Sequence, residues 1–295
     1  MFFHCLELRF FSAAPKKNFD FHCLKYLSEY LARKEYNEKP PHPVGDGMTQ
    51  GPYIVTGASK GIGRAIAQEI AKQGYPVIAL ARASEELDSI GGELALLHSK
   101  SMALACDLSN SNDIEAAATH ICSHFPWIAG LVHNAGTIIP VQPLDQVPIP
   151  LWSASIQVNL VGVQDLTQRL MVNMGGSHQT RITTISSGAA LSPVESWSAY
   201  CVSKAGLDMW ARCIALEGIP LNISAISIAP GIVDTDMQLT IRSVNPEDFP
   251  RHPDFVSLYT SGQLTQSRDV AVQLYPLILN HSMEQSGQRF DVREL

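Results

Sequence analysis

Residues 53–73 read YIVTGASKGIGRAIAQEIAKQ, which is an apolar run, a glycine-rich turn and then a stretch of helical character. In the turn, Gly57, Gly61 and Gly63 would let the backbone pass close to a diphosphate, and the N-terminus of the following helix would face its charge. The spacing is GxxxGxG, which differs from the GxGxxG of the commonest dinucleotide-binding turn. A glycine turn can be no more than a tight loop, but its place between a strand and a helix favours a nucleotide site.

The alternation of strand and helix continues along the chain. Further apolar runs lie at residues 76–81, 102–105, 128–133, 181–186 and 223–229, and helical segments lie at 84–98, 113–125, 150–173 and 198–217. The helix over 84–98 is expected to break at Gly91-Gly92. This alternation predicts an α/β fold with a single Rossmann-type, doubly wound parallel sheet and helices on both faces. Ligands of such sheets bind at the carboxyl ends of the strands, where the sequence has Gly57, Arg82, Asp107, Asn134, Ser187 and Gly231.

Composition excludes several classes of function. The chain has 295 residues and a net charge of −7 with no block of basic residues, so we expect no nucleic-acid partner. No apolar run approaches the roughly 20 residues that cross a bilayer, so we expect no membrane association. The six cysteines form no CxxC pair, which indicates reduced thiols and a cytoplasmic protein. No second histidine or cysteine stands at metal-ligand spacing from His133, so we expect no metal site there and a packed His133 at a strand end.

The first 47 residues differ from the rest of the chain. They mix aromatic, basic and acidic residues without periodicity, and residues 39–47 read KPPHPVGDG, whose prolines stop a helix. Three interpretations stay open: a mitochondrial transit peptide, a disordered tail, or upstream sequence joined to a gene that starts at Met48. The acidic residues argue against the first, since transit peptides avoid them. We therefore expect an extension over 1–47 and a functional domain over 48–295.

A hydroxyl, a phenol and an amine stand close together in residues 187–204, which read SGAALSPVESWSAYCVSK. If the segment from Ser198 onward is helical, Tyr200 and Lys204 leave the same face one turn apart. The lysine charge would then lower the pKa of Tyr200 from roughly 10 towards neutrality. Such a phenol can give a proton to a carbonyl oxygen, or take one from an alcohol, near pH 7. Ser187 follows the apolar run 181–186, and the end of that strand would deliver its hydroxyl to the same point.

The second strand ends at a cation. Where an NAD-specific site would place an acid for the ribose 2′-hydroxyl, the sequence has Arg82. Arg82, together with Lys60 in the glycine turn, would suit a 2′-phosphate because a guanidinium binds a phosphate through two hydrogen bonds. The alternative is that both are solvated surface cations. The missing acid favours the first interpretation, and we expect NADPH rather than NADH.

Two further regions bear on the substrate. Asn159 is the polar member of an apolar stripe in 150–173, and it is either a satisfied buried amide or part of the active site. The segment 236–260 contains three prolines and is expected to be an irregular, mobile flap over the cleft. Trp197, Met237 and Leu239 are candidate walls for an aromatic or dicarbonyl substrate, although each could equally be ordinary packing.

These motifs, taken in order, resemble the short-chain dehydrogenase/reductase family. The residues that carry the resemblance are TGASKGIG at 56–63, NAG at 134–136, Asn159, Ser187, Tyr200 with Lys204, and PG at 230–231. Within the family, the segments SSGAA (186–190), WSAYCVSKAGLD (197–208) and APGIVDTDMQ (229–238) are similar to the benzil reductases that form (S)-benzoin and to sepiapterin reductase. The resemblance covers the chain from about Pro52 to its end.

The resemblance implies a role for each matched residue. Tyr200 would be the general acid, Lys204 would lower its pKa and bind the nicotinamide ribose, Ser187 would hold the substrate carbonyl, and Asn159 would position a proton-relaying water. The residues that would surround the cofactor are Gly57, Ser59, Lys60, Gly61, Ile62, Gly63, Arg82, Asp107, Leu108, Asn134, Tyr200, Lys204, Ile232 and Thr235.

The sequence therefore predicts an NADPH-dependent carbonyl reductase that reduces a ketone or dicarbonyl to an alcohol, acting as a homodimer as the family does. Two alternatives stay open. One is an alcohol dehydrogenase that uses NAD⁺, and the other is a nucleotide-sensing regulator without catalysis. The presence of Ser187, Tyr200 and Lys204 counts against the regulator, since a sensor does not need them.

Overall fold

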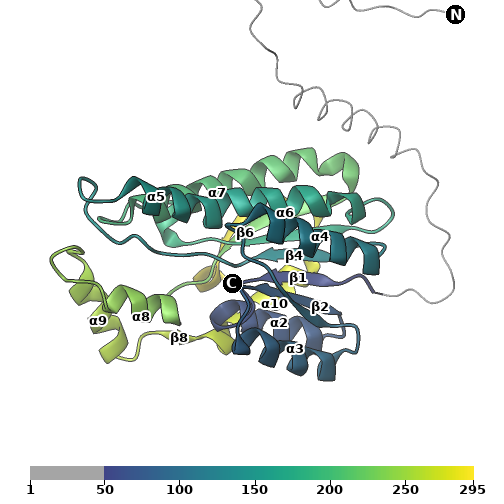
Figure 1. The fold of residues 1–295 in the computed structure, drawn as a ribbon, viewed down its shortest axis with the longest axis horizontal. Helices are drawn as coiled ribbons and strands as arrows, with labels where there is room; N and C mark the ends of the chain where they lie inside the picture. Colours follow the sequence, from purple (N-terminus) through teal and green to yellow (C-terminus); the bar gives the residue numbers. More distant parts are fainter. Residues whose placement is uncertain (1–49) are drawn as a thin grey trace, which may run out of the picture. The chain divides into compact units, whose positions relative to one another are not determined.

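The structure is a computed structural model and describes residues 50–295, so the predictions for residues 1–47 lie outside the described part. Seven parallel strands form its central sheet in the order β3-β2-β1-β4-β5-β6-β9 (Figure 1). The strands are β1 Tyr53–Thr56, β2 Val77–Ala81, β3 Met102–Ala105, β4 Gly130–His133, β5 Thr180–Ile185, β6 Ile223–Ala229 and β9 Arg289–Asp291. The five central strands are buried along nearly their whole length, as a sheet that is covered on both faces requires.

Helices cover both faces of the sheet (Figure 1). One layer consists of α2 Gly61–Lys72, α3 Glu85–Leu97 and α10 Ser267–Asn280, and the other contains α4 Ser111–His124, α5 Ile149–Ile156, α6 Gly162–Leu170 and α7 Ser198–Glu217. Each layer encloses its own apolar core against the sheet. The predicted doubly wound α/β fold is therefore confirmed.

Helix α3 runs without a break, and the expected interruption at Gly91-Gly92 is wrong. A Cβ atom on Gly91 would lie 2.8 Å from the Cβ atom of Ala103 in β3. Glycine at this position allows α3 to approach the edge of the sheet closely, so it serves packing and does not end the helix. Ser84 caps the start of α3 by accepting a hydrogen bond from the backbone of Leu87.

The segment 150–173 is not one regular helix. Between α5 and α6 lies a π-helical turn, η1 Gln157–Val161. After α6 the segment ends in a short 3₁₀ turn, η2 Met171–Asn173. The π turn contains Asn159. Turns of this kind inside helices are often found at functional sites, since they change the direction of a side chain.

The segment 236–260 was expected to be irregular, and this is wrong. It contains two helices, α8 Asp236–Arg242 and α9 His252–Thr260, which lie apart from both helical layers (Figure 1). The side chains of Ile241, Phe249 and Phe255 are buried in a third apolar cluster together with Trp197 and Tyr200. Burial of aromatic side chains by these helices gives the segment a packed structure despite its prolines.

Candidate active site

Helix α7 brings the phenol and the amine of the proposed site together. It begins at Ser198 and ends at Glu217, before Gly218, so Tyr200 and Lys204 lie one turn apart in its first half. Both side chains are buried, and the Lys204 Nζ atom lies 5.7 Å from the centroid of the Tyr200 ring. The structure thus places the two groups on one face of the helix.

Ser187 meets this pair from the sheet. It directly follows Ser186 at the end of β5, and its hydroxyl forms a hydrogen bond with Tyr200. The Ser187 Oγ atom also accepts a hydrogen bond of 3.2 Å from the backbone of Ala189, which caps a short 3₁₀ turn. These contacts hold the hydroxyl beside the phenol, as the expected arrangement of Ser187, Tyr200 and Lys204 requires.

The predicted lowering of the Tyr200 pKa is wrong in this structure. Burial raises the pKa of Tyr200 to about 12, and the Ser187 hydrogen bond lowers it only in part. The Lys204 Nζ atom donates a hydrogen bond of 2.7 Å to the backbone carbonyl of Ile185. The phenol is therefore protonated at pH 7. This is the form in which it can act as an acid and give its proton to a carbonyl oxygen.

Lys204 carries its charge inside the protein. Burial lowers the pKa of Lys204 to about 8, and the negative charge of Asp208, one turn further along α7, acts in the opposite direction. Lys204 is thus mainly charged at neutral pH despite its burial.

Asn159 is a satisfied buried amide that lies against the lysine. Its Oδ1 atom accepts from the backbone of Thr137 at 2.8 Å, and its Nδ2 atom donates to the Thr137 carbonyl at 2.9 Å and to the Ser203 hydroxyl at 3.0 Å. A Cβ atom on Gly136 would lie 3.3 Å from Asn159 Oδ1 and 3.6 Å from Lys204 Nζ. The interpretation of Asn159 as a satisfied buried amide is confirmed, and its part in the active site stays a prediction.

The glycine turn leaves the N-terminus of α2 open to an anion. Lys60 stands at the N-cap position without a capping hydrogen bond from its side chain, whereas Ser84 and Asn110 cap α3 and α4. The open N-terminus fits a diphosphate, because its backbone N–H groups need acceptors and its dipole favours negative charge. Gly57 has a φ of 64°, and Gly61 has a φ of 56°, which glycine adopts without strain.

The side chain of Asn134 stabilises this turn through hydrogen bonds. Its Nδ2 atom donates to the carbonyls of Thr56 at 2.9 Å and Gly57 at 3.2 Å. A Cβ atom on Gly63 would lie 2.3 Å from Asn134 Nδ2 and 2.4 Å from the Gly57 carbonyl oxygen, so only glycine fits there. Ser59 belongs to the same turn, and Ile62 lies in the first turn of α2.

Arg82, Asp107 and Leu108 lie at the ends of the two neighbouring strands, β2 and β3. Hydrogen bonds from Ser109, and to a smaller extent the nearby Arg82 charge, hold the pKa of Asp107 below its ordinary value. Leu108 is buried, and its carbonyl oxygen would lie 2.2 Å from a Cβ atom on Gly162, so this backbone packs tightly on α6. Arg82 is exposed, so its guanidinium is open to solvent at the end of β2.

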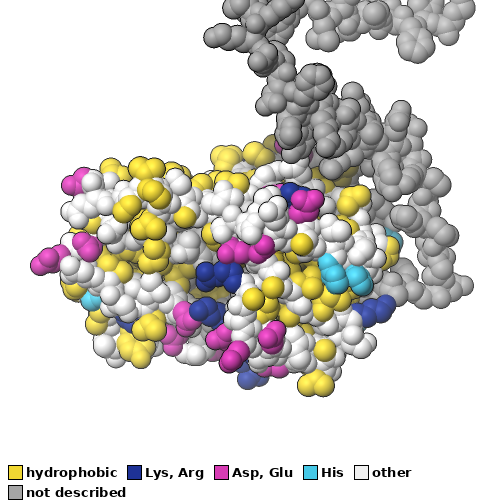
Figure 2. All heavy atoms as spheres, in the orientation of Figure 1, with side chains coloured by type: hydrophobic (Ala, Val, Ile, Leu, Met, Phe, Trp, Pro, Cys, Tyr) yellow, Lys and Arg dark blue, Asp and Glu magenta, His cyan; other side chains and the backbone are white. Residues whose placement is uncertain are grey.

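Lys60 is engaged by a residue of α8. Its Nζ atom lies 2.5 Å from a carboxylate oxygen of Asp236, and both side chains are about two-thirds exposed. Figure 2 shows basic side chains beside acidic ones in the middle of this face, between the two helical layers. Exposed ion pairs contribute little to stability, so Lys60 could exchange Asp236 for a ligand phosphate at low cost.

Ile232 and Thr235 follow Pro230-Gly231 at the end of β6. A Cβ atom on Gly61 would meet the Thr235 side chain at 3.3 Å, so Thr235 lies directly against the glycine turn. Ile232 is 37% exposed, which leaves its side chain open to a ligand. The segment after β6 thus borders the same turn as the expected diphosphate site.

Tyr200 belongs to a cluster of aromatic side chains. It consists of Trp197, Tyr200, Phe249 and Phe255, and the Trp197 and Phe249 rings stack with their centroids 5.4 Å apart. Of the candidate substrate walls, Trp197 belongs to this cluster and Met237 packs against it. Leu239 is 57% exposed and lies outside the cluster, so the structure does not support it as a wall.

Several residues near the site could not be identified from single motifs. Ser203 holds Asn159, Gly136 makes room for Lys204, and Phe249 and Phe255 complete the aromatic cluster. Asp208 offered one signal, because it stands four residues after Lys204 and therefore on the same helical face. The two phenylalanines lie in a segment without clear periodicity and offered none.

Within residues 50–295, no cluster of histidine, cysteine or acidic side chains could hold a metal ion. His133 is buried and its Nε2 atom lies 2.7 Å from the Thr167 hydroxyl, so it is packed as expected. Among the helices of the described residues, none is both long enough and apolar enough to cross a membrane.

Residues 53–245 match the family model described as "short chain dehydrogenase". The benzil reductase of Bacillus subtilis that forms (S)-benzoin is 32% identical over 252 residues, which cover 82% of this chain and 98% of that protein. The crystal structure of the KRED1-Pglu enzyme superposes with a TM-score of 0.75 at 32% identity, over 81% of this chain and 100% of that one. A short chain dehydrogenase from Burkholderia cenocepacia in complex with NADP superposes with a TM-score of 0.70 at 26% identity, over 82% and 96% of the two chains.

Proposed function

The chain belongs to the short chain dehydrogenase family, and from this we propose that it is an NADPH-dependent carbonyl reductase that converts a ketone or a dicarbonyl to an alcohol. The observation that carries the proposal is the meeting of Tyr200, Ser187 and Lys204, with the Lys204 amine beside Gly136. The residues of 48–295 would then form the catalytic domain.

Each residue of the group has a separate task in the proposed reaction. The nicotinamide cofactor supplies the hydride when it is bound. Ser187 would donate a hydrogen bond to the substrate carbonyl oxygen, and Tyr200 would transfer its proton to that oxygen as negative charge develops there. Lys204 would favour that transfer through its charge, and Asn159 would hold the lysine end of the site through its contacts with Thr137 and Ser203.

Arg82 supports the preference for NADPH. It stands exposed at the end of β2, where an NAD-specific site would have an acid, and a related structure contains NADP. A guanidinium at this place would bind a 2′-phosphate, whereas an acid would repel it. Ser59, Ile62, Asp107, Leu108, Ile232 and Thr235 would line the rest of the cofactor.

The aromatic cluster supports an apolar, ring-bearing substrate. The Trp197 ring contacts the Tyr200 ring edge-on, and the rings of Phe249 and Phe255 contact Trp197 in turn. An aromatic or benzil-like dicarbonyl, or a flat pterin-like ring, would gain both burial and ring contacts there. Trp197 would be the wall nearest to the reacting carbonyl, since its ring contacts the Tyr200 ring edge-on.

An apolar surface over α5 and α7 bears on the assembly of the protein. Three apolar side chains are exposed along one face of α7, namely Val202, Met209 and Leu216, and Figure 2 shows apolar side chains gathered over α5. We therefore propose that this side forms a homodimer.

The cysteines bear on the compartment. The four cysteines of the described residues are free thiols, which supports a reducing compartment such as the cytoplasm.

A panel of cofactors and substrates tests the proposal. The purified protein would be assayed with NADPH and with NADH against diketones, quinones, pterins and aromatic aldehydes, and with NAD⁺ against the corresponding alcohols. We expect turnover of a dicarbonyl or an aromatic carbonyl with NADPH. Activity confined to NAD⁺ and alcohols would favour a dehydrogenase, and cofactor binding without any turnover would favour a sensor.

A further inference from the structure

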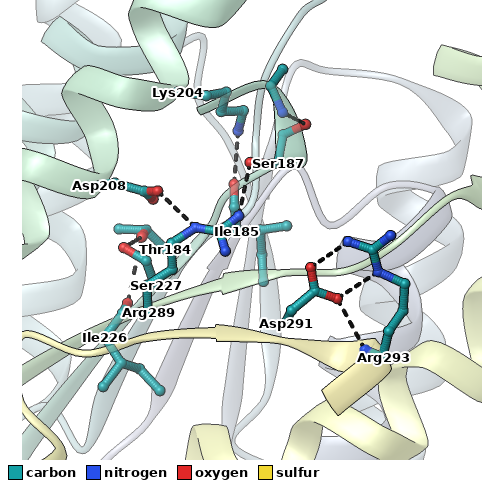
Figure 3. A network of polar contacts seen from close by, with 11 residues as sticks. Thr184, Ile185, Ser187, Lys204, Asp208, Ile226, Ser227, Arg289, Asp291 and Arg293 are labelled. Atoms are coloured by element: carbon teal, nitrogen blue, oxygen red, sulfur yellow. Dashed lines mark hydrogen bonds and ion pairs between the residues drawn. The ribbon is translucent and has the colours of Figure 1, made fainter. Parts of the chain in front are cut away.

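The short C-terminal strand β9 places an arginine, Arg289, next to the proposed active site. Strand β9 pairs with β6, and β6 pairs with β5, so Arg289 lies two strands from the end of β5. One terminal nitrogen of its guanidinium donates a hydrogen bond of 3.0 Å to the backbone carbonyl of Ser187 (Figure 3). The Nε atom donates a second bond of 3.0 Å to the Asp208 carboxylate.

The first contact fixes the residue that would hold the substrate. Ser187 stands where the chain leaves β5, and its side chain contacts Tyr200 while its carbonyl accepts from Arg289. Because the carbonyl and the hydroxyl belong to one residue, anchoring the carbonyl limits the orientation of the hydroxyl.

The second contact concerns the lysine. Asp208 stands one turn after Lys204, and its charge acts on that ammonium. The Asp208 side chain is only 13% exposed, and its Oδ1 atom has no hydrogen-bond partner among the described residues. Arg289 therefore neutralises a carboxylate that is largely removed from water and close to the catalytic lysine.

We propose that Arg289 is a positioning residue of this active site, which holds Ser187 through its carbonyl and limits the field of Asp208 on Lys204. The proposal rests on the function proposed above, since it assumes that Ser187 and Lys204 serve the reaction. The guanidinium is suited to this because its planar fork reaches two acceptors at once, which a lysine ammonium does not reproduce.

The chain offers a matched control in Arg293. Arg293 stands four residues after Arg289, and its two hydrogen bonds from guanidinium nitrogens both go to Asp291, at 2.8 and 2.6 Å (Figure 3). Its side chain is 68% exposed and, among the described residues, forms no hydrogen bond or ion pair with Ser187 or Asp208. Arg293→Met thus removes a paired arginine from the same segment without touching the proposed site.

The first measurement needs no turnover. The pKa of Lys204 would be followed by NMR on protein with carbon-labelled lysine, with Lys204→Met used for assignment. We expect the pKa of Lys204 to rise by about one unit in Arg289→Met, to fall by about one unit in Asp208→Asn, and to stay unchanged in Arg293→Met. General loosening of the fold would move the first two variants in the same direction, so opposite shifts separate positioning from damage.

The second measurement is kinetic. In Arg289→Met we expect kcat to fall roughly tenfold or more while the dissociation constant of NADPH stays within about twofold, because only the catalytic geometry changes. Arg293→Met should keep the kcat of the unaltered protein. If Arg289→Met does not fold, Arg289→Lys replaces it in both measurements, with an intermediate loss of kcat expected because the ammonium reaches only one of the two acceptors.

Opposite outcomes overturn the inference. A Lys204 pKa that is the same in the Arg289 variant and in the Arg293 variant would contradict it, and so would equal kcat values in those two variants. The two proposals fail in different ways. If the unaltered protein shows no turnover but the Lys204 pKa shifts as expected in the Arg289 and Asp208 variants, only the reductase function is removed.

Discussion

At the scale of single residues, Lys204 keeps a charge in a buried place. Its side chain is 3% exposed, and burial lowers its pKa from 10.5 to about 8. The folded pKa lies below the unfolded one, so between these pH values the unfolded chain binds more protons. The destabilisation from Lys204 is therefore complete below about pH 8 and is relieved as the pH rises towards 10.5.

We predict that Lys204→Met stabilises the protein at pH 7 while it removes the proposed activity. The gain should be of order 2 kcal/mol, because the relief of ammonium burial exceeds the loss of one hydrogen bond to Ile185. The difference from the unaltered protein should shrink as the pH rises from 8 to 10.5, as measured by urea denaturation. Lys100→Met, at an exposed lysine, serves as the control, and an equal difference at all pH values would contradict the prediction.

Arg82 carries a prediction about the cofactor. In Arg82→Asp we expect the ratio of kcat/KM for NADPH to that for NADH to fall by roughly tenfold or more, since a carboxylate repels a 2′-phosphate and can accept from a ribose hydroxyl. Steady-state kinetics with both cofactors measures this ratio. The same ratio in the variant and in the unaltered protein would remove Arg82 from the 2′-phosphate site.

Sequence motifs predicted the principal residues of the site, but they could not predict properties that depend on tertiary contacts. Tyr200, Lys204 and Ser187 could be placed because helical spacing and strand ends set their positions. The pKa of Tyr200 could not be predicted, because it depends on how far tertiary neighbours such as Trp197 bury the phenol. Arg289 lay beyond any local pattern, since its partners stand 81 and 102 residues earlier in the chain.

At the scale of elements, helix α3 shows two neighbouring glycines with different roles. A Cβ atom on Gly91 would approach Ala103 within 2.8 Å, whereas a Cβ atom on Gly92 would meet nothing within 4 Å. The sequence alone cannot separate them, because the distinction lies in the distance between α3 and β3.

We predict opposite stability changes for these two positions. Gly91→Ala should lower the free energy of unfolding by about 1 to 3 kcal/mol, because the added methyl group must push α3 away from the sheet. Gly92→Ala should raise it by roughly 0.5 to 1 kcal/mol, because alanine favours a helix without any new contact. Denaturant unfolding of both variants measures the changes, and equal effects would contradict the observed packing of α3.

The elements that alternate regularly were predictable, and the irregular ones were not. Mainly apolar runs gave β1, β2 and β6 nearly their observed bounds, because buried parallel strands need no polar face. The π turn around Asn159, the helices α8 and α9, and the three-residue strand β9 escaped prediction. Each is held by contacts with distant parts of the chain, and short or proline-containing segments show too little periodicity to reveal them.

At the scale of the whole molecule, α7 links the proposed active site to the proposed subunit contact. Its inner face carries Tyr200 and Lys204, and its outer face exposes Val202, Met209 and Leu216 at intervals of seven residues. An apolar row of this kind on a single helix fits association with a second copy.

We predict that Met209→Glu weakens the proposed dimer. The charge would be buried against the apolar row of the partner copy, so the molar mass measured by light scattering should fall towards that of one chain. Leu96→Glu is the matched control, because Leu96 is an exposed leucine on α3, away from this row, and should leave the mass unchanged. Equal masses for both variants would show that the dimer, if present, uses another surface.

The central claim is that the Tyr200 phenol protonates the carbonyl oxygen of the substrate. Tyr200→Phe tests it most directly, because the change removes one oxygen atom and keeps the ring in the aromatic cluster. We expect kcat to fall on the order of 10²- to 10⁴-fold while the dissociation constant of NADPH, measured by fluorescence titration, stays within about twofold. A variant that turns over substrate as fast as the unaltered protein would contradict the account.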